Sequence, residues 1–134
     1  MSRSIAFLCG LFAASAVSAT VSTGAWAATP QSLFNDNCSA CHQTSGKGVK
    51  GAFPALAGDP LVQGDAAPLT ATVLAGRAGM PAFKDDLNDA DLSAVLTYIR
   101  TAWGNTGKPV TAADVAAARA KLKTAKKPAS LQAH

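Results

Sequence analysis

The pentapeptide Cys38-Ser39-Ala40-Cys41-His42 constrains this chain more than any other stretch. Two cysteines separated by two residues and followed at once by a histidine are typical of covalent c-type haem attachment. On a helix, positions 38, 41 and 42 share one face, so two thiols can reach the vinyl groups at a porphyrin edge while the imidazole reaches the iron. The motif therefore predicts one haem c, bound through Cys38 and Cys41, with His42 as an iron ligand.

Three other interpretations of the same cysteines stay open on the motif alone. In an oxidising compartment, Cys38 and Cys41 can form a structural disulfide, and a thioredoxin-like redox pair has the same spacing. A zinc site needs about three or four protein ligands, and the only other histidine is His134. Neither the disulfide nor the redox pair gives a role to His42, so the pentapeptide favours haem.

The first 27 residues have the organisation of a secretory signal peptide. Arg3 supplies a positive charge, residues 5–21 are mostly apolar or small, and Ala25-Trp26-Ala27 is an A-x-A cleavage site. We expect cleavage after Ala27, a haem domain over residues 28–110, and a C-terminal helix with a basic tail over 111–134. An uncleaved membrane anchor is the alternative, because the apolar stretch is only slightly too short to span a bilayer. Either way the expected compartment is the periplasm, where bacterial c-type haem is attached.

Charge is distributed unevenly along the chain. Residues 28–118 carry six basic residues against eight aspartates, and the formal net charge of +4 comes from Arg3 and the five basic residues at positions 119–127. Basic residues confined to one terminal segment, without interleaved aromatic residues, do not predict a nucleic-acid surface. We expect this segment, Arg119 included, to be a solvated and frayed tail; contact with an acidic partner or a membrane surface is the alternative.

Cap signals and apolar spacing predict an all-α fold of about four to five helices wrapped around one haem. Helices are expected from Thr29-Pro30 to the pentapeptide, over 68–77, from the Asn88 cap through Trp103, and from Thr111 to about Thr124. The apolar stripe of the third of these needs a partner, and Leu33 and Phe34 of the first are expected to provide it. Residues 43–65 are rich in glycine and proline, and we expect an irregular loop that packs Phe53, Leu56 and Leu61 against the porphyrin.

Met80 is the only methionine that remains after signal removal. A lone methionine often fills a gap in a core. This one lies between Gly79 and Pro81 in a stretch that cannot continue a helix, where presentation of the thioether explains it better. A soft sulfur opposite an imidazole favours reduced iron, so we predict Met80 as the second axial ligand.

Together these stretches resemble a class I c-type cytochrome. The resemblance is carried by the pentapeptide, by Phe53-Pro54-Ala55-Leu56-Ala57-Gly58, by Gly79-Met80-Pro81-Ala82-Phe83, and by Leu96-Thr97-Tyr98-Ile99-Arg100 with Trp103-Gly104-Asn105. More narrowly, their order is similar to that in haem domains of the cytochrome c subunits that serve membrane-bound bacterial alcohol dehydrogenases. The resemblance covers residues 33–114, nearly all of the expected mature chain.

The resemblance implies further residue roles. The carbonyl of Pro54 would accept a hydrogen bond from the His42 nitrogen that does not face the iron. Phe34 would pack on the last family helix, although Pro30 stands where the family commonly has glycine, which implies a looser or shifted helix crossing. Arg77 has two interpretations. It can pair with a haem propionate, or it can stabilise the C-terminus of its helix as a basic residue.

The predicted function is one-electron transfer without chemical transformation of a substrate. Partners would be redox proteins, namely a dehydrogenase, an oxidase or a reductase, that dock transiently at an exposed haem edge. We expect no nucleic-acid partner, and contact with a membrane only through these proteins. One alternative is a haem protein with an open or labile sixth site that binds small ligands or peroxide; another is a colourless thiol redox module.

Overall fold

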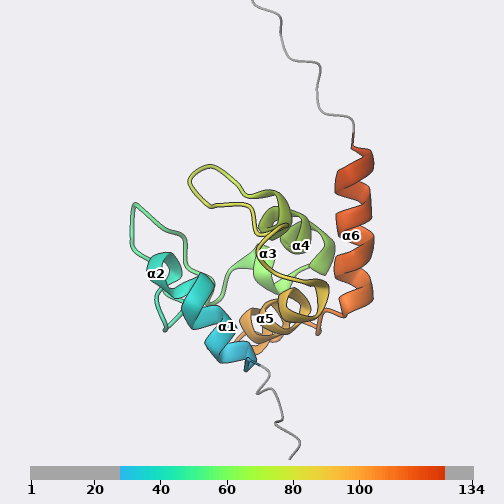
Figure 1. The fold of residues 1–134 in the computed structure, drawn as a ribbon. Coiled ribbons are helices and arrows are strands. Elements are labelled where there is room, and N and C mark those ends of the chain that lie inside the picture. The colour runs from blue at the N-terminus through green and yellow to red at the C-terminus, as the bar shows by residue number, and fades with distance from the viewer. Residues whose placement is uncertain (1–27, 126–134) are drawn as a thin grey trace, which may run out of the picture.

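A computed structural model of the chain describes residues 28–125 and shows a helical fold (Figure 1). Its helices are α1 (Pro30–Asn37), α2 (Ser39–His42), α3 (Pro60–Gln63), α4 (Ala66–Ala75), α5 (Asp89–Thr101) and α6 (Ala112–Thr124). Within the described part there is no strand, only isolated bridges between Val49 and Phe53 and between Arg77 and Met80. The all-α prediction is confirmed. Six helices instead of four or five are present because α2 and α3 are single turns of four residues.

The predicted signal peptide at 1–27 and the end of the predicted basic tail at 126–134 lie outside the described residues. In the part of the chain that the structure describes, no helix has the length and apolarity needed to cross a membrane.

Local capping explains where the long helices begin. The Thr29 hydroxyl accepts a hydrogen bond from the Ser32 N–H at 3.1 Å, and Pro30 takes the first helical position of α1. Asn88 caps α5 through the Asp91 N–H at 2.9 Å. Thr111 and Asp114 form the predicted reciprocal capping box at the start of α6.

Helix α4 differs in its limits from the prediction over 68–77. Asp65 caps it by accepting a hydrogen bond from the Ala67 N–H at 3.3 Å, so the helix starts two residues before Pro68 and ends at Ala75. A proline is tolerated in the first turn, because the first N–H groups of a helix have no partner within the helix.

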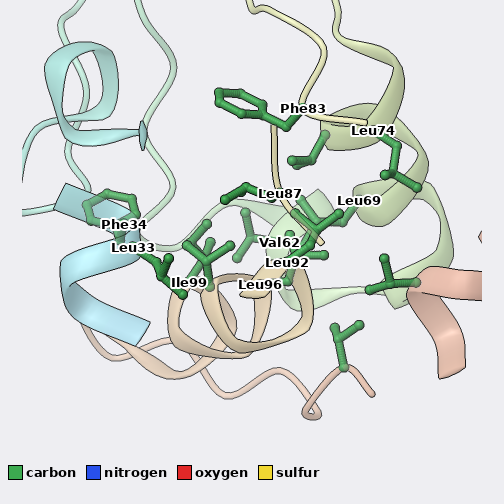
Figure 2. Packing of buried hydrophobic residues seen from close by; sticks show 14 residues of the cluster. Leu33, Phe34, Val62, Leu69, Leu74, Phe83, Leu87, Leu92, Leu96 and Ile99 are labelled. Carbon is green, nitrogen blue, oxygen red and sulfur yellow. The ribbon is translucent and has the colours of Figure 1, made fainter. Parts of the chain in front are cut away.

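The core forms where α1 crosses α5. Phe34 is fully buried, and its ring centroid lies 5.6 Å from that of Tyr98 and 5.0 Å from that of Trp103. Figure 2 shows Leu33 and Phe34 of α1 facing Leu96 and Ile99 of α5, the packing that the apolar stripe predicted. Pro30, at the first position of α1, is compatible with complete burial of the aromatic ring.

Helix α5 ends earlier than predicted. Its last residue is Thr101, and Trp103 lies beyond it with a φ of +54°. Trp103 still packs on the α1 and α5 aromatic rings, and its indole N–H donates to the Thr44 carbonyl at 3.1 Å. Ile99 and Trp103 therefore pack in the same core, as their four-residue spacing indicated, although the helix does not continue to Trp103.

Helix α6 lies along α4 and α5 (Figure 1) and buries Val115 completely. The expectation of a solvated basic tail is wrong for Arg119, whose side chain is only 20% exposed and forms an ion pair with Asp89 at 2.8 Å. Lys121 and Lys123 are exposed, as expected.

Candidate haem site

A cavity of about 510 Å³ contains all six predicted site residues in its lining. They come from separate parts of the chain and are Cys38, Cys41, His42, Pro54, Arg77 and Met80. The cavity is lined by residues of the α1–α2 segment, of the connection between α4 and α5, and of α5 itself. Residues far apart in sequence thus meet in one space of the size of a cofactor site, which spans about 300–1,000 Å³.

The junction of α1 and α2 shapes the thiol side of this cavity. Cys38 has φ −125°, which interrupts the helix, and a new turn begins at Ser39. Within that turn the N–H groups of Cys41 and His42 donate to the Cys38 carbonyl at 3.3 Å and 3.0 Å. The three motif side chains consequently share one face, as helical spacing predicted.

Both thiols are half-buried, and the surroundings of Cys38 do not favour thiol exchange. Burial, and to a smaller extent the neighbouring Cys41, together raise the pKa of the Cys38 thiol to about 11. Reactive cysteines of redox proteins have a lowered thiol pKa, because the thiolate is the nucleophile. The environment of Cys38 raises its thiol pKa, which disfavours the thiolate.

His42 is oriented by a backbone acceptor. Its Nδ1 lies 2.9 Å from the Pro54 carbonyl oxygen. Because a carbonyl oxygen can only accept, Nδ1 is protonated and donates this hydrogen bond. In the neutral imidazole with this tautomer, Nε2 carries the lone pair with which a histidine ligates a metal. The contact that the resemblance implied is therefore present.

Gly48 permits this contact. It has φ +62°, and a Cβ at this position would lie 2.4 Å from the Phe53 carbonyl oxygen and 2.5 Å from the Pro54 oxygen. Only glycine, without a side chain, lets the backbone approach so closely at this dihedral angle. The glycine-rich loop thus brings the Pro54 carbonyl to the imidazole.

Met80 reaches the cavity on a loop that folds back on the end of α4. Gly76 turns the chain with φ +75°, and a Cβ there would meet the Met80 carbonyl oxygen at 2.8 Å. Arg77 and Met80 then exchange two backbone hydrogen bonds of 3.1 Å and 2.9 Å. Farther along, the Phe83 N–H donates to the Val73 carbonyl at 3.1 Å, which fixes the loop to α4.

Arg77 lies in the lining but is exposed. Within residues 28–125 it forms no ion pair with a carboxylate. Its guanidinium is therefore available to an anion at the mouth of the cavity, and it also favours the C-terminal end of α4.

The lining fits a haem in chemistry as well as in size. Apart from the sulfur and nitrogen atoms of the motif residues, the walls are mainly apolar, with Leu69, Val73, Phe83, Leu87, Val95, Leu96 and Ile99 among the buried side chains. The loop residues Phe53, Leu56 and Leu61 also line the cavity, although Phe53 keeps 41% of its surface exposed. An apolar wall with a few convergent ligands is what a porphyrin with a central metal requires.

Comparison with known proteins identifies the family. Residues 25–99 match the protein family described as "Cytochrome C oxidase, cbb3-type, subunit III". The chain belongs to this family of c-type cytochromes. As a monohaem c-type cytochrome it carries covalently bound haem c and takes part in electron transfer. The disulfide, thiol redox and zinc interpretations of the pentapeptide are thereby superseded.

Several curated relatives are similar to this cytochrome. The cytochrome c-552 of Thermus thermophilus is 36% identical over 107 residues, which cover 65% of this chain and 82% of the relative. The cytochrome c subunit of the quinone alcohol dehydrogenase of Gluconobacter oxydans (strain 621H) is 33% identical over 111 residues, 73% of this chain and 22% of that protein. The cytochrome c subunit of the gluconate 2-dehydrogenase of Pantoea cypripedii is 38% identical over 105 residues, 68% of this chain. The chain spans less than a quarter of the length of these two dehydrogenase subunits.

Sequence reasoning missed one buried cation of this cytochrome. Arg100 is 2% exposed and donates to three backbone carbonyls, those of Lys108 at 2.6 Å, Val62 at 2.8 Å and Gly64 at 2.9 Å. It joins α5 to the α3 segment, where Val62 lines the cavity. Position 100 follows Leu96 by four residues, so the helical stripe itself marked it as inward-facing.

Asn105 is a second buried polar residue, and the family resemblance alone assigned it no structural role. It is 5% exposed, and its amide bridges the two sides of the fold. Oδ1 accepts from the Gly58 N–H at 2.8 Å, while Nδ2 donates to the Leu56 carbonyl at 3.0 Å and the Ile99 carbonyl at 2.8 Å. The cavity loop is thereby held to the end of α5.

Proposed function

We propose that this cytochrome carries single electrons between protein partners, with haem c attached through Cys38 and Cys41 and the iron held by His42 and Met80. The observation that supports it best is that one cavity is lined by both thiols, by an imidazole whose Nδ1 is hydrogen-bonded to a backbone carbonyl, and by a thioether. The haem, when bound, supplies the one-electron iron couple. The protein's part is to attach, orient and bury it.

The surrounding residues adjust the site. The Pro54 carbonyl holds the imidazole in one orientation and increases its basicity through the 2.9 Å hydrogen bond. A thioether ligand and an apolar wall both favour the reduced state and raise the potential. Arg77 is proposed to pair with a propionate at the rim.

The proposed partners are a dehydrogenase, an oxidase or a reductase that docks transiently. This proposal draws on relatives that are the cytochrome c subunits of a quinone alcohol dehydrogenase and a gluconate 2-dehydrogenase. A further relative, from Azospirillum brasilense, is a cbb3-type cytochrome c oxidase subunit, 36% identical over 81 residues. We propose a periplasmic location after removal of the signal peptide at 1–27, a cytochrome domain at 28–110, and membrane contact only through partners.

The test is an absorption spectrum of the protein purified from periplasm, oxidised and reduced, with carbon monoxide added to the reduced form. Low-spin haem c with a sulfur-to-iron charge-transfer band, insensitive to carbon monoxide, is expected for the wild type. Met80→Ala is expected to lose the band and to bind carbon monoxide. A high-spin wild type that binds carbon monoxide would refute His/Met ligation and favour the labile sixth site.

A further inference from the structure

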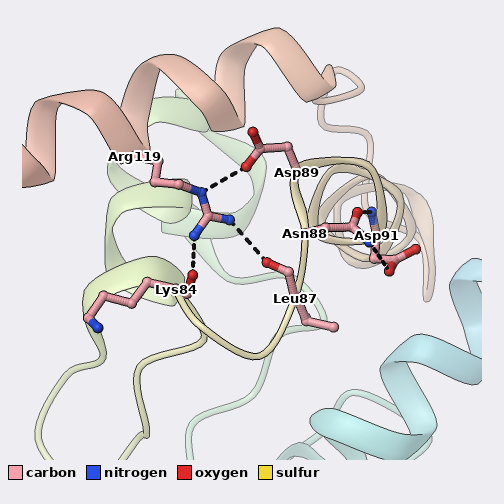
Figure 3. Close-up of polar contacts among 6 residues, drawn as sticks. All are labelled: Lys84, Leu87, Asn88, Asp89, Asp91 and Arg119. Atoms are coloured by element: carbon pink, nitrogen blue, oxygen red, sulfur yellow. Dashed lines mark hydrogen bonds and ion pairs between the residues drawn. The ribbon is translucent and has the colours of Figure 1, made fainter.

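All three guanidinium nitrogens of Arg119, on α6, donate hydrogen bonds to the segment that follows Met80. Figure 3 shows the guanidinium reaching from α6 to Lys84, Leu87 and Asp89. Nε donates to the Asp89 carboxylate at 2.8 Å, Nη2 donates to the Leu87 carbonyl at 3.0 Å, and Nη1 donates to the Lys84 carbonyl. One side chain thus holds three successive points of the chain between the loop and the start of α5.

The segment has few other anchors. Between Met80 and Asn88, only two backbone N–H groups donate to backbone carbonyls, that of Phe83 to Val73 and that of Leu87 to Phe83 at 3.3 Å. Phe83 and Leu87 are buried and line the haem cavity, so the inner face of the segment faces the haem site while α6 holds its outer face. Loss of the Arg119 bonds would leave the carbonyls of Lys84 and Leu87 without these donors.

Helix α6 is itself a firm support. Its capping box fixes the first turn, and Val115, one turn before Arg119, is completely buried. The family match ends at residue 99, so α6 lies outside the part of the chain that the family defines.

We propose that Arg119 is a positioning residue that keeps the Met80 loop closed against the haem, so that α6 sets how readily the sixth iron ligand is released. This inference rests on the proposed ligation by Met80. Arginine suits the role because its planar guanidinium offers five donors in a fixed fork. A lysine at the same position keeps the charge beside Asp89 but cannot hold three acceptors in that geometry.

The experiment measures ligand exchange at the iron of the folded holoprotein. Imidazole is titrated into the ferric form of the wild type, Arg119→Gln and Arg119→Lys, and binding is followed by loss of the sulfur-to-iron band. Imidazole can bind only when Met80 is released, so its apparent Kd falls as the released fraction rises. We expect Arg119→Gln to bind imidazole about tenfold more tightly, which corresponds to one hydrogen bond to a charged group, with Arg119→Lys in between.

Two control variants separate this role from charge and from global stability. Lys121→Gln removes a positive charge from an exposed position of the same helix, and Thr29→Ala removes the α1 cap far from the loop in sequence. Both are expected to bind imidazole as the wild type does, although Thr29→Ala lowers the urea midpoint. A structural role alone would make imidazole affinity follow the urea midpoint across all four variants.

The outcomes are distinct. If the wild type has the sulfur band and Met80→Ala loses it, but Arg119→Gln binds imidazole with wild-type affinity, the positioning role is refuted and the ligation stands. If Arg119→Gln does not fold with haem, the test uses Arg119→Lys: imidazole affinity above that of the wild type supports the positioning role, and wild-type affinity refutes it. A wild type without the band refutes the ligation proposal, and the inference about Arg119 with it.

Discussion

Replacing Arg100 by methionine tests how much the hydrogen bonds from this buried arginine to backbone carbonyls contribute to the stability of the fold. Methionine keeps an unbranched apolar stem but leaves the carbonyls of Val62, Gly64 and Lys108 without their donors. A buried acceptor without a partner costs about 1–3 kcal/mol. We take the low end for each carbonyl, because the bonds to Lys108 and Gly64 are only partly buried and methionine also removes the desolvation cost of the guanidinium. The expected loss for the three carbonyls is about 3 kcal/mol.

This loss is large for a domain whose unfolding free energy is about 5–15 kcal/mol. With a urea m-value of about 1.5 kcal/mol/M, the unfolding midpoint followed by far-UV circular dichroism falls by about 2 M. Lys123→Met, at an exposed position of α6, is the matched control and is expected to stay within about 0.5 kcal/mol of the wild type. An Arg100→Met midpoint equal to that of the control would show that the three carbonyls reach other donors, and the reasoning would fail.

Three further changes have defined outcomes. Gly48→Ala places a Cβ 2.5 Å from the Pro54 carbonyl oxygen, so we expect a weakened bond to the imidazole, seen as a changed histidine Nδ1–H resonance in NMR spectra of the reduced protein. Phe34→Ala empties a fully buried site and should cost about 3–5 kcal/mol in urea unfolding. Hydrogen bonds from the Thr111 hydroxyl and N–H lower the pKa of the Asp114 carboxyl below its usual 3.8. The carboxylate therefore adds to the free energy of unfolding at neutral pH, and this stabilisation is lost as pH falls through the folded-state pKa. Urea unfolding should show Asp114→Asn to be less stable than the wild type at about pH 6 and equally stable at about pH 2.

The parts of the structure with short-range signals were predictable from sequence. The pentapeptide predicted that both thiols and the imidazole face one space, and Cys38, Cys41 and His42 do line the same cavity. Thr29-Pro30, Asn88 and the Thr111–Asp114 pair marked helix starts, since a cap acts on N–H groups only two or three residues away. Where a signal lies within one helical turn, its reading does not depend on the rest of the fold.

Helix α3 shows how a correct local signal was overlooked. Asp59-Pro60 repeats the cap-and-proline pattern of Thr29-Pro30, and the Asp59 carboxylate accepts from the N–H groups of Leu61 and Val62 at 2.8 Å and 3.1 Å. The surrounding glycines and prolines indicated an irregular loop, and that composition outweighed the cap. Composition averages over a window, whereas capping concerns individual atoms, so the cap was the better guide here.

The two arginines expose a different limit. Arg100 and Arg119 have charges that suggest a surface position, yet both donate to backbone carbonyls in the two segments that contribute Val62 and Leu87 to the cavity lining. A chain that wraps a prosthetic group with loops has many backbone carbonyls that no helix satisfies, and backbone carbonyls leave no mark in the sequence. The donor can be recognised in the sequence, because position 100 continues the buried stripe of Leu92 and Leu96. An arginine on the apolar face of a helix, in a chain with long glycine-rich loops, is therefore better interpreted as a buried donor to those loops than as an interruption of the stripe.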